Sequence, residues 1–324
     1  MNRRNFLTRI TTAAGAAAVG SVAAGAVSPP AAEALVTDPR TPRNPRISEW
    51  QHAKSTSLPD PGRLTDQFQG MCTDGSYWYV VVNDGDFRGI YRMTMGFVYT
   101  GLRLAVPSGC PHIGAPTFDP DRRQIYVPVE GTEPPKIWKV STDLRSLGMV
   151  PMWGRATGTL PPQSSKNPYL AFNPYDRLVY SSVSGFKESS LPRVDAIHGY
   201  DRDSGLLRKT IPLPSGLHRV QGATFGPDGM NFYVASDYEE ASNGCKHIYA
   251  YDFSHARDGV TAPTWGKVAV PHADNEVECV VLASYAWRDA RATSVIVGIL
   301  DDAEYDFTDD VYLRHFWVPD PARL

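Results

Sequence analysis

The sequence predicts an all-β protein of the β-propeller class, with five four-stranded blades as the simplest arrangement. Three segments share one motif: Phe, a small or polar residue and Pro, followed by a β-branched or aromatic run. The phenylalanines of this motif are Phe118, Phe172 and Phe225, so the steps between copies are 54 and 53 residues. Four short strands with their turns need roughly fifty residues, and repeating units of that size are typical of propeller blades.

The composition also favours many short strands joined by tight turns. The chain of 324 residues contains 27 Gly, 27 Pro, 16 Tyr and 7 Trp. Tyr and Trp are enriched in strands, whereas Gly and Pro are enriched in turns. A two-sheet sandwich would explain the short strands, but it does not explain the regular step between copies.

Five blades fit between about residues 67 and 318. Degenerate copies of the motif at 69–72 and 278–281 flank the three clear copies. Six blades are the alternative, but the extra blade would have to recruit residues 46–63, which contain two prolines that disfavour regular strand.

We therefore divide the chain into three parts. Residues 1–34 form a signal peptide, residues 35–66 a linker with a candidate closing strand for the last blade, and residues 67–324 the propeller domain. The first part resembles a twin-arginine export signal, because Arg3 and Arg4 precede an apolar run rich in Ala and Gly. That run is too short and too weakly hydrophobic to be a convincing membrane anchor. We expect cleavage after Ala34 and a secreted, extracytoplasmic protein without a stable anchor.

Charge and missing motifs exclude several function classes. The chain carries 32 Lys and Arg against 35 Asp and Glu, and its basic residues are scattered, so we expect no nucleic-acid partner. There is no Gly-x-Ser-x-Gly elbow, no glycine-rich nucleotide loop and no His or Cys spacing typical of zinc.

The starts of the innermost strands are polar, which predicts a hydrogen-bonding funnel at one end of the propeller axis. An inert scaffold would place apolar residues at these buried positions. The predicted funnel residues are Gln69, His112, Asn167, Tyr169, His218, Gln221, Glu276 and Glu278.

A second polar ring follows the second strand of each blade. Its members stand four residues after an aligned aromatic or β-branched position, and they are Asn83, Glu130, Ser184, Asp237 and Asp301. Carboxylates gathered in this way can bind a divalent cation such as Ca²⁺, contact sugar hydroxyls, or act as general acid and base. The alternative is turn chemistry, since Asp, Asn and Ser often cap backbone amides where a strand ends.

These two rings define our candidate site. A histidine at the funnel could be a general base, and Arg219 could neutralise a substrate carboxylate. A histidine at a strand start can instead bond to a carbonyl of the neighbouring blade. The candidate catalytic residues are His112, Glu130, Asp237 and Glu278; the candidate substrate-binding residues are Gln69, Asn167, Tyr169, His218, Arg219 and Gln221; and the candidate metal ligands are Asp237, Glu278 and Asp301.

Four cysteines in an exported protein permit disulfides. Cys72 and Cys279 lie on the innermost strands of the first and last blades, where a bond would fasten the ring. Cys110 and Cys245 would then remain as a second pair. The alternative is buried free thiols or a single bridge.

Two of the strand starts resemble those of secreted bacterial propellers of the gluconolactonase-like and phytase-like group. The resemblance is carried by residues 220–225, which read Val-Gln-Gly-Ala-Thr-Phe, and by Glu276-Val277-Glu278, where Cys279 replaces the glycine of that group. It implies a divalent cation near the axis and activity on lactones, phosphate esters or sugars.

We therefore expect an enzyme that acts on a carbohydrate or a related ester or lactone. The alternative function is a non-catalytic propeller that binds a cell-wall glycan or a protein partner.

Overall fold

The structure is a computed structural model that describes residues 43–58, 67–84, 86–163, 165–184, 193–238, 245–271, 276–284, 293–301, 310–319 and 324. These residues belong to one compact unit, 39–324. The predicted signal peptide and its cleavage position lie outside the described residues.

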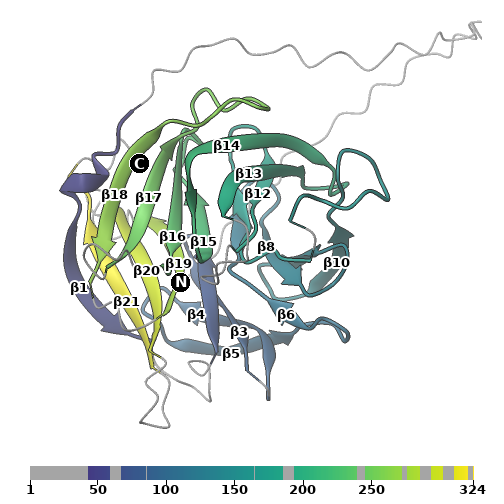
Figure 1. Cartoon of the computed structure of the whole chain (residues 1–324). Helices are drawn as coiled ribbons and strands as arrows, with labels where there is room; N and C mark the ends of the chain where they lie inside the picture. The colour runs from purple at the N-terminus through teal and green to yellow at the C-terminus, as the bar shows by residue number, and fades with distance from the viewer. Residues whose placement is uncertain are drawn as a thin grey trace, which may run out of the picture. The chain divides into compact units, whose positions relative to one another are not determined.

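Five antiparallel sheets form a five-bladed β-propeller (Figure 1), which confirms the predicted fold class and the blade number. The first blade contains β2 (Phe68–Thr73), β3 (Tyr77–Asn83), β4 (Arg88–Thr94) and β5 (Tyr99–Ala105). The second contains β6 (His112–Ile113), β7 (Thr117–Asp119), β8 (Gln124–Glu130), β9 (Lys136–Ser141) and β10 (Ser146–Pro151). Its innermost strand is divided between β6 and β7, which both pair with β8.

The remaining blades follow in chain order. The third contains β11 (Ala171–Phe172), β12 (Leu178–Ser181), β13 (Val194–Asp201) and β14 (Leu207–Leu217). The fourth contains β15 (Val220–Phe225), β16 (Asn231–Ser236), β17 (Lys246–Asp252) and β18 (Thr264–Val270). The fifth contains β19 (Glu276–Ser284), β20 (Thr293–Asp301), β21 (Asp310–Trp317) and the N-terminal strand β1 (Gln51–Ser57).

The fifth blade combines strands from the two ends of the propeller. β1 pairs antiparallel with β21 as the outermost strand, as Figure 1 shows. The short 3-10 helix η1 (Ile47–Glu49) precedes β1 and packs against β18 of the fourth blade. Next to it, the Trp50 and Tyr233 rings lie 5.3 Å apart. The fifth blade is therefore complete only when strands from the two ends of the propeller pair.

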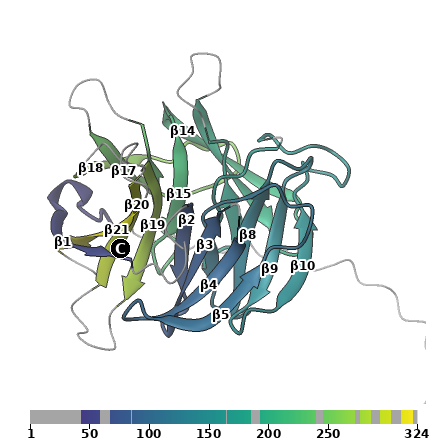
Figure 2. The ribbon, with the colours of Figure 1, turned by 90° about the horizontal axis from the view of Figure 1, so that it is seen from below.

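The innermost strands contact one another around the ring in the order β2, β7, β11, β15 and β19, and β19 returns to β2. Figure 2 shows the first blade from another side, with β2, β3, β4 and β5 following one another. The strands approach closely at Gly70, where an added Cβ would lie 2.8 Å from the Ala115 Cβ and 3.2 Å from the Cys279 Cβ. At Gly222 an added Cβ would lie 2.6 Å from the Cys279 Cα. Glycine is required at both positions because the axis has no room for a side chain.

The repeated tyrosines of the second strands have a structural role. All four are buried, and in the first three blades the hydroxyl donates a hydrogen bond to an Asp that lies at or next to the turn before its strand, whereas the Tyr233 hydroxyl of the fourth blade has no such partner. The pairs are Tyr79 with Asp74 at 3.0 Å, Tyr126 with Asp119 at 2.6 Å and Tyr180 with Asp176 at 2.6 Å. This contact satisfies a buried hydroxyl, and it explains why the aromatic position recurs in the blades.

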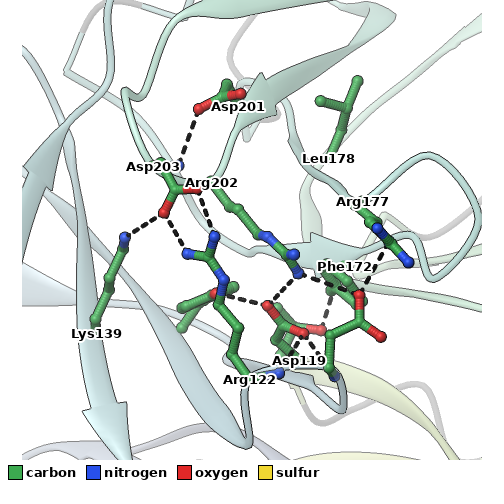
Figure 3. Close-up of polar contacts among 12 residues, drawn as sticks. Asp119, Arg122, Lys139, Phe172, Arg177, Leu178, Asp201, Arg202 and Asp203 are labelled. Carbon is green, nitrogen blue, oxygen red and sulfur yellow. Dashed lines mark hydrogen bonds and ion pairs between the residues drawn. The ribbon is translucent and has the colours of Figure 1, made fainter. Parts of the chain in front are cut away.

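An ion-pair network, drawn in Figure 3, joins the second and third blades. Asp119 ends β7 and Arg202 follows β13, so the network lies at the end of the ring opposite the innermost-strand starts. The buried Asp119 accepts from Arg202 at 2.6 Å. Nearby, Asp203 accepts from the Arg122 Nη2 at 2.6 Å and lies 3.4 Å from the Lys139 Nζ. We interpret this network as a stabilising contact between the two blades, since its acids and bases neutralise one another.

All four cysteines are free thiols, so the predicted Cys72–Cys279 disulfide is wrong for this structure. The two residues lie on adjacent blades but belong to different core clusters. Cys72 packs with Tyr79 and Ile113, whereas Cys279 packs in the cluster that contains Phe68. The predicted second pair, Cys110 with Cys245, is likewise absent.

Candidate functional site

Three innermost strands carry a β-bulge at the end of the axis where the funnel was predicted. The pairing register shifts between Phe68 and Gly70 in the first blade, between Val220 and Gly222 in the fourth, and between Val277 and Cys279 in the fifth. A bulge leaves one residue outside the ladder and redirects its side chain. The bulged residues are Gln69, Gln221 and Glu278, which therefore hold the same position in three consecutive blades of the ring.

Glu278 is the most perturbed member of this group. It is 3 % exposed, and Glu276 stands two residues earlier on the same strand. Burial raises the pKa of Glu278 well above its usual range, and the negative charges of Glu276 and Asp237 raise it further. Arg219 opposes the rise. This environment favours the neutral carboxylic acid.

Two cations from the fourth blade surround Asp237, which directly follows β16. The Arg219 Nη2 lies 2.7 Å from Asp237 and 3.0 Å from Glu276, so one guanidinium connects both acids. The Lys246 Nζ lies 2.5 Å from the Asp237 Oδ1. Burial raises the pKa of Asp237, and the two cations oppose that effect.

The backbone of Arg219 is strained, with φ at 43°. Positive φ is uncommon for residues other than glycine. With Glu278 neutral, the two cations balance the charges of Asp237 and Glu276.

A second pair lies at the corresponding position of the second blade. The His112 Nδ1 is 2.7 Å from the Glu130 Oε1, and the His112 side chain is 42 % exposed. Burial raises the pKa of Glu130, but the hydrogen bond and charge of His112 outweigh it, and the pKa is lowered overall. The carboxylate can therefore orient the imidazole, as a general base requires.

The second polar ring proves to be a series of contacts between blades. Asn83 accepts the backbone N–H of Ile113 at 3.1 Å, Glu130 accepts that of Asn167 at 3.2 Å, and Asp237 accepts that of Val277 at 2.8 Å. In each case the acceptor lies at or just after the end of the second strand of one blade, and the donor lies at or before the start of the innermost strand of the next. At Ser184 the backbone carbonyl takes this role and accepts from Val220 at 2.7 Å. The side chain of Asp301 lies outside the described part of the chain.

Two predicted substrate-binding residues are fully buried. The Asn167 side chain accepts from the Ser181 hydroxyl, and Tyr169 packs in the core with its hydroxyl close to Ser182. Burial raises the pKa of Tyr169, which does not suit a proton-transfer group. We leave both residues out of the proposed site, because their contacts are with protein.

The other candidates lie nearer the surface. The His218 and Tyr238 rings contact each other at a tilt of 40° with centroids 4.9 Å apart, and Arg193 donates to the His218 Nε2 at 3.2 Å. Gln69 and Gln221 are half-buried, and the Gln69 amide donates to the Phe68 carbonyl at 3.2 Å.

Sequence reasoning missed Lys246, which neutralises Asp237. The sequence feature that could have revealed this residue is a lysine at the start of β17, a strand that is otherwise mostly apolar and aromatic. Arg219 was predicted to bind a substrate carboxylate, whereas the structure shows it already paired with Asp237 and Glu276.

The described residues at this end of the axis do not favour a cation. In the described ranges, no three His, Cys, Asp or Glu residues are grouped as metal ligands. Asp237 is paired with Arg219 and Lys246, whose charges would repel a metal ion. We therefore assign no step of the chemistry to a metal.

No protein-family model matches this sequence, and no curated protein is significantly similar to it. Over the residues that the structure covers, no helix is long and apolar enough to cross a membrane.

Proposed function

We propose that the protein is a secreted enzyme that acts on a carbohydrate or a related ester or lactone, with Glu278 as its general acid. One observation carries the proposal: the buried carboxyl group of Glu278 stands on an axial bulge, and the negative charges of Glu276 and Asp237 lie close enough to raise its pKa. Two adjacent carboxyl groups that share a proton are a common source of an acid that remains protonated at neutral pH. The resemblance of the strand starts to gluconolactonase-like and phytase-like propellers, and the twin-arginine pattern, support the substrate class and the export.

The proposed chemistry is hydrolysis by general acid and general base. Glu278 donates its proton to the leaving oxygen of a glycoside, ester or lactone as the bond to carbon breaks. His112, oriented by Glu130, takes a proton from the water that attacks that carbon. Both residues start innermost strands at the same end of the ring. The proton that Glu278 loses returns from His112 through solvent after product leaves.

A binding propeller is the second candidate. It is favoured by the contacts of Glu130 and Asp237, which both accept backbone N–H groups of the next blade. Such contacts need no reaction to explain them. In this case the funnel would bind a cell-wall glycan or a protein partner without turnover.

Turnover of chromogenic glycosides, aryl esters and sugar lactones distinguishes the two candidates. Glu278→Gln should lower kcat by about 10²–10⁴-fold, the usual effect of losing general acid catalysis. Gln51→Ala is the matched control, because Gln51 is exposed on the outermost strand β1. Full activity of a folded Glu278→Gln variant would remove Glu278 from the mechanism. Absence of turnover by the wild-type protein on all three classes would favour the binding propeller.

A further inference from the structure

The three bulged residues offer hydrogen bonds without a net charge. Gln69 and Gln221 each carry an amide that can donate and accept, and a neutral Glu278 can do the same. A sugar hydroxyl also donates and accepts, so it matches all three groups. The bulges lie close together, because Gly70 and Gly222 both approach Cys279 at the next position of each strand.

At the position of the bulged residue, hydrogen-bonding side chains come only from the fourth, fifth and first blades. The residue of the second blade that faces Gly70 is Ala115, and the one before it is Gly114. In the third blade Tyr169 pairs with Ala115 in a parallel bridge, and the residue before it is Pro168. Gly114 and Pro168 have no polar side chain, so the fourth, fifth and first blades supply the polar groups.

The cations near the bulges are already neutralised. Arg219 is shared between Asp237 and Glu276, and Lys246 pairs with Asp237. An anionic ligand would have to break one of these pairs, and it would then lie beside the carboxylate of Glu276. Both effects disfavour anions relative to neutral ligands of the same shape.

We propose that Gln69, Gln221 and Glu278 form a binding site for uncharged, hydroxyl-bearing ligands, namely neutral sugars and their lactones, and that this site discriminates against uronates and phosphate esters. The inference rests on the proposed function for the location of the site, and it narrows the substrate class within it.

The test is calorimetric titration of the purified protein at pH 7 with glucose, glucuronate and glucose 6-phosphate, which differ only at C6. We expect glucose to bind at least tenfold more tightly than either anion. Gln69→Ala and Gln221→Ala should each weaken glucose binding about three- to tenfold, the range for one lost hydrogen bond to a neutral group. Gln51→Ala should leave the affinity unchanged.

Glu278→Gln separates this inference from the proposed function. The Gln side chain is neutral and still donates, so glucose affinity should remain within about threefold while turnover is lost. Tighter binding of either anion, equal binding of all three compounds, or no heat with any of them at millimolar concentration would overturn the inference. Binding of glucose with no turnover of any glycoside, ester or lactone would refute the enzyme proposal and leave the inference standing.

Discussion

Replacing Glu278 with Gln should make the protein more stable at neutral pH, although it removes the proposed acid. In the folded protein the pKa of Glu278 lies well above its usual 4.5, chiefly because of burial and then because of Glu276 and Asp237. In the unfolded chain the same carboxyl ionises near 4.5. Between these two pKa values the folded state holds one more proton than the unfolded state, so the free energy of unfolding decreases as the pH rises.

The size of this effect follows from proton linkage. One proton of difference changes the free energy of unfolding by about 1.4 kcal/mol per pH unit at 25 °C. Gln cannot ionise, and its amide can donate to Glu276 in place of the carboxyl proton. Wild type and variant should therefore be similar near pH 4. Above pH 4.5 the variant should gain on wild type by about 1.4 kcal/mol per unit, until the folded pKa is reached.

Urea unfolding followed by tryptophan fluorescence at pH 4, 5, 6 and 7 measures this difference. The matched control is Glu49→Gln, because the Glu49 side chain is 51 % exposed. The free energy of unfolding of this variant should change with pH in the same way as that of wild type. A gap between wild type and Glu278→Gln that stays constant from pH 5 to 7 would show that Glu278 is ionised in the folded protein. The reasoning for its role as an acid would then fail.

Three further predictions test the structure around the site. Gly222→Ala should destabilise the protein by about 1–3 kcal/mol through overpacking. In the control Gly96→Ala, the added Cβ meets only the Thr94 Oγ1 at 3.8 Å, so stability should change by less than about 0.5 kcal/mol. Equal melting temperatures of the two variants would contradict the close packing of the strands at the axis. Asp119→Ala leaves the mostly buried Arg202 with only Asp121, 3.5 Å away, and removes the acceptor of the Tyr126 hydroxyl, so it should destabilise the protein by about 3 kcal/mol. Loss of the exposed Arg155 in Arg155→Ala should change stability by less than about 1 kcal/mol. A denaturant midpoint unchanged in Asp119→Ala would refute a stabilising role for this network. Burial lowers the pKa of His315 to about 4, and Lys54 and His52 nearby add to that effect. Between pH 6.5 and 4 the unfolded chain therefore binds one proton more than the folded protein, so the free energy of unfolding should decrease by about 1.4 kcal/mol per unit as the pH falls through that range. Urea titrations of His315→Asn should show this loss removed, and an unchanged pH dependence would rule out His315 as its source.

The blade repeat could be read from the sequence because it is a local property. The motif at Phe118, Phe172 and Phe225 recurs at one step, and each copy starts a strand pair whose partners are close in the chain. The polar strand starts and strand ends were visible for the same reason. Period and residue type along a short segment are enough to place Glu130, Asp237 and Glu278 at one end of a blade.

The contacts that decide the chemistry required the tertiary structure. Whether Glu278 is paired in the ladder or bulged depends on its register against β20, which no residue of β19 specifies alone. Arg219 looked available for a substrate, but it is held by Glu276, 57 residues later in the chain. Whether a polar side chain near the axis meets protein or ligand is likewise decided by other blades, as the burial of Asn167 and Tyr169 shows.

Sequence alone thus determined the architecture and which residues gather at the axis, because strand period and turn chemistry act over a few neighbouring residues. Only the tertiary structure decided the protonation of Glu278, the pairing of Asp237 with Lys246 and the closure of the ring by β1, because charge, burial and strand register depend on residues far apart in the chain.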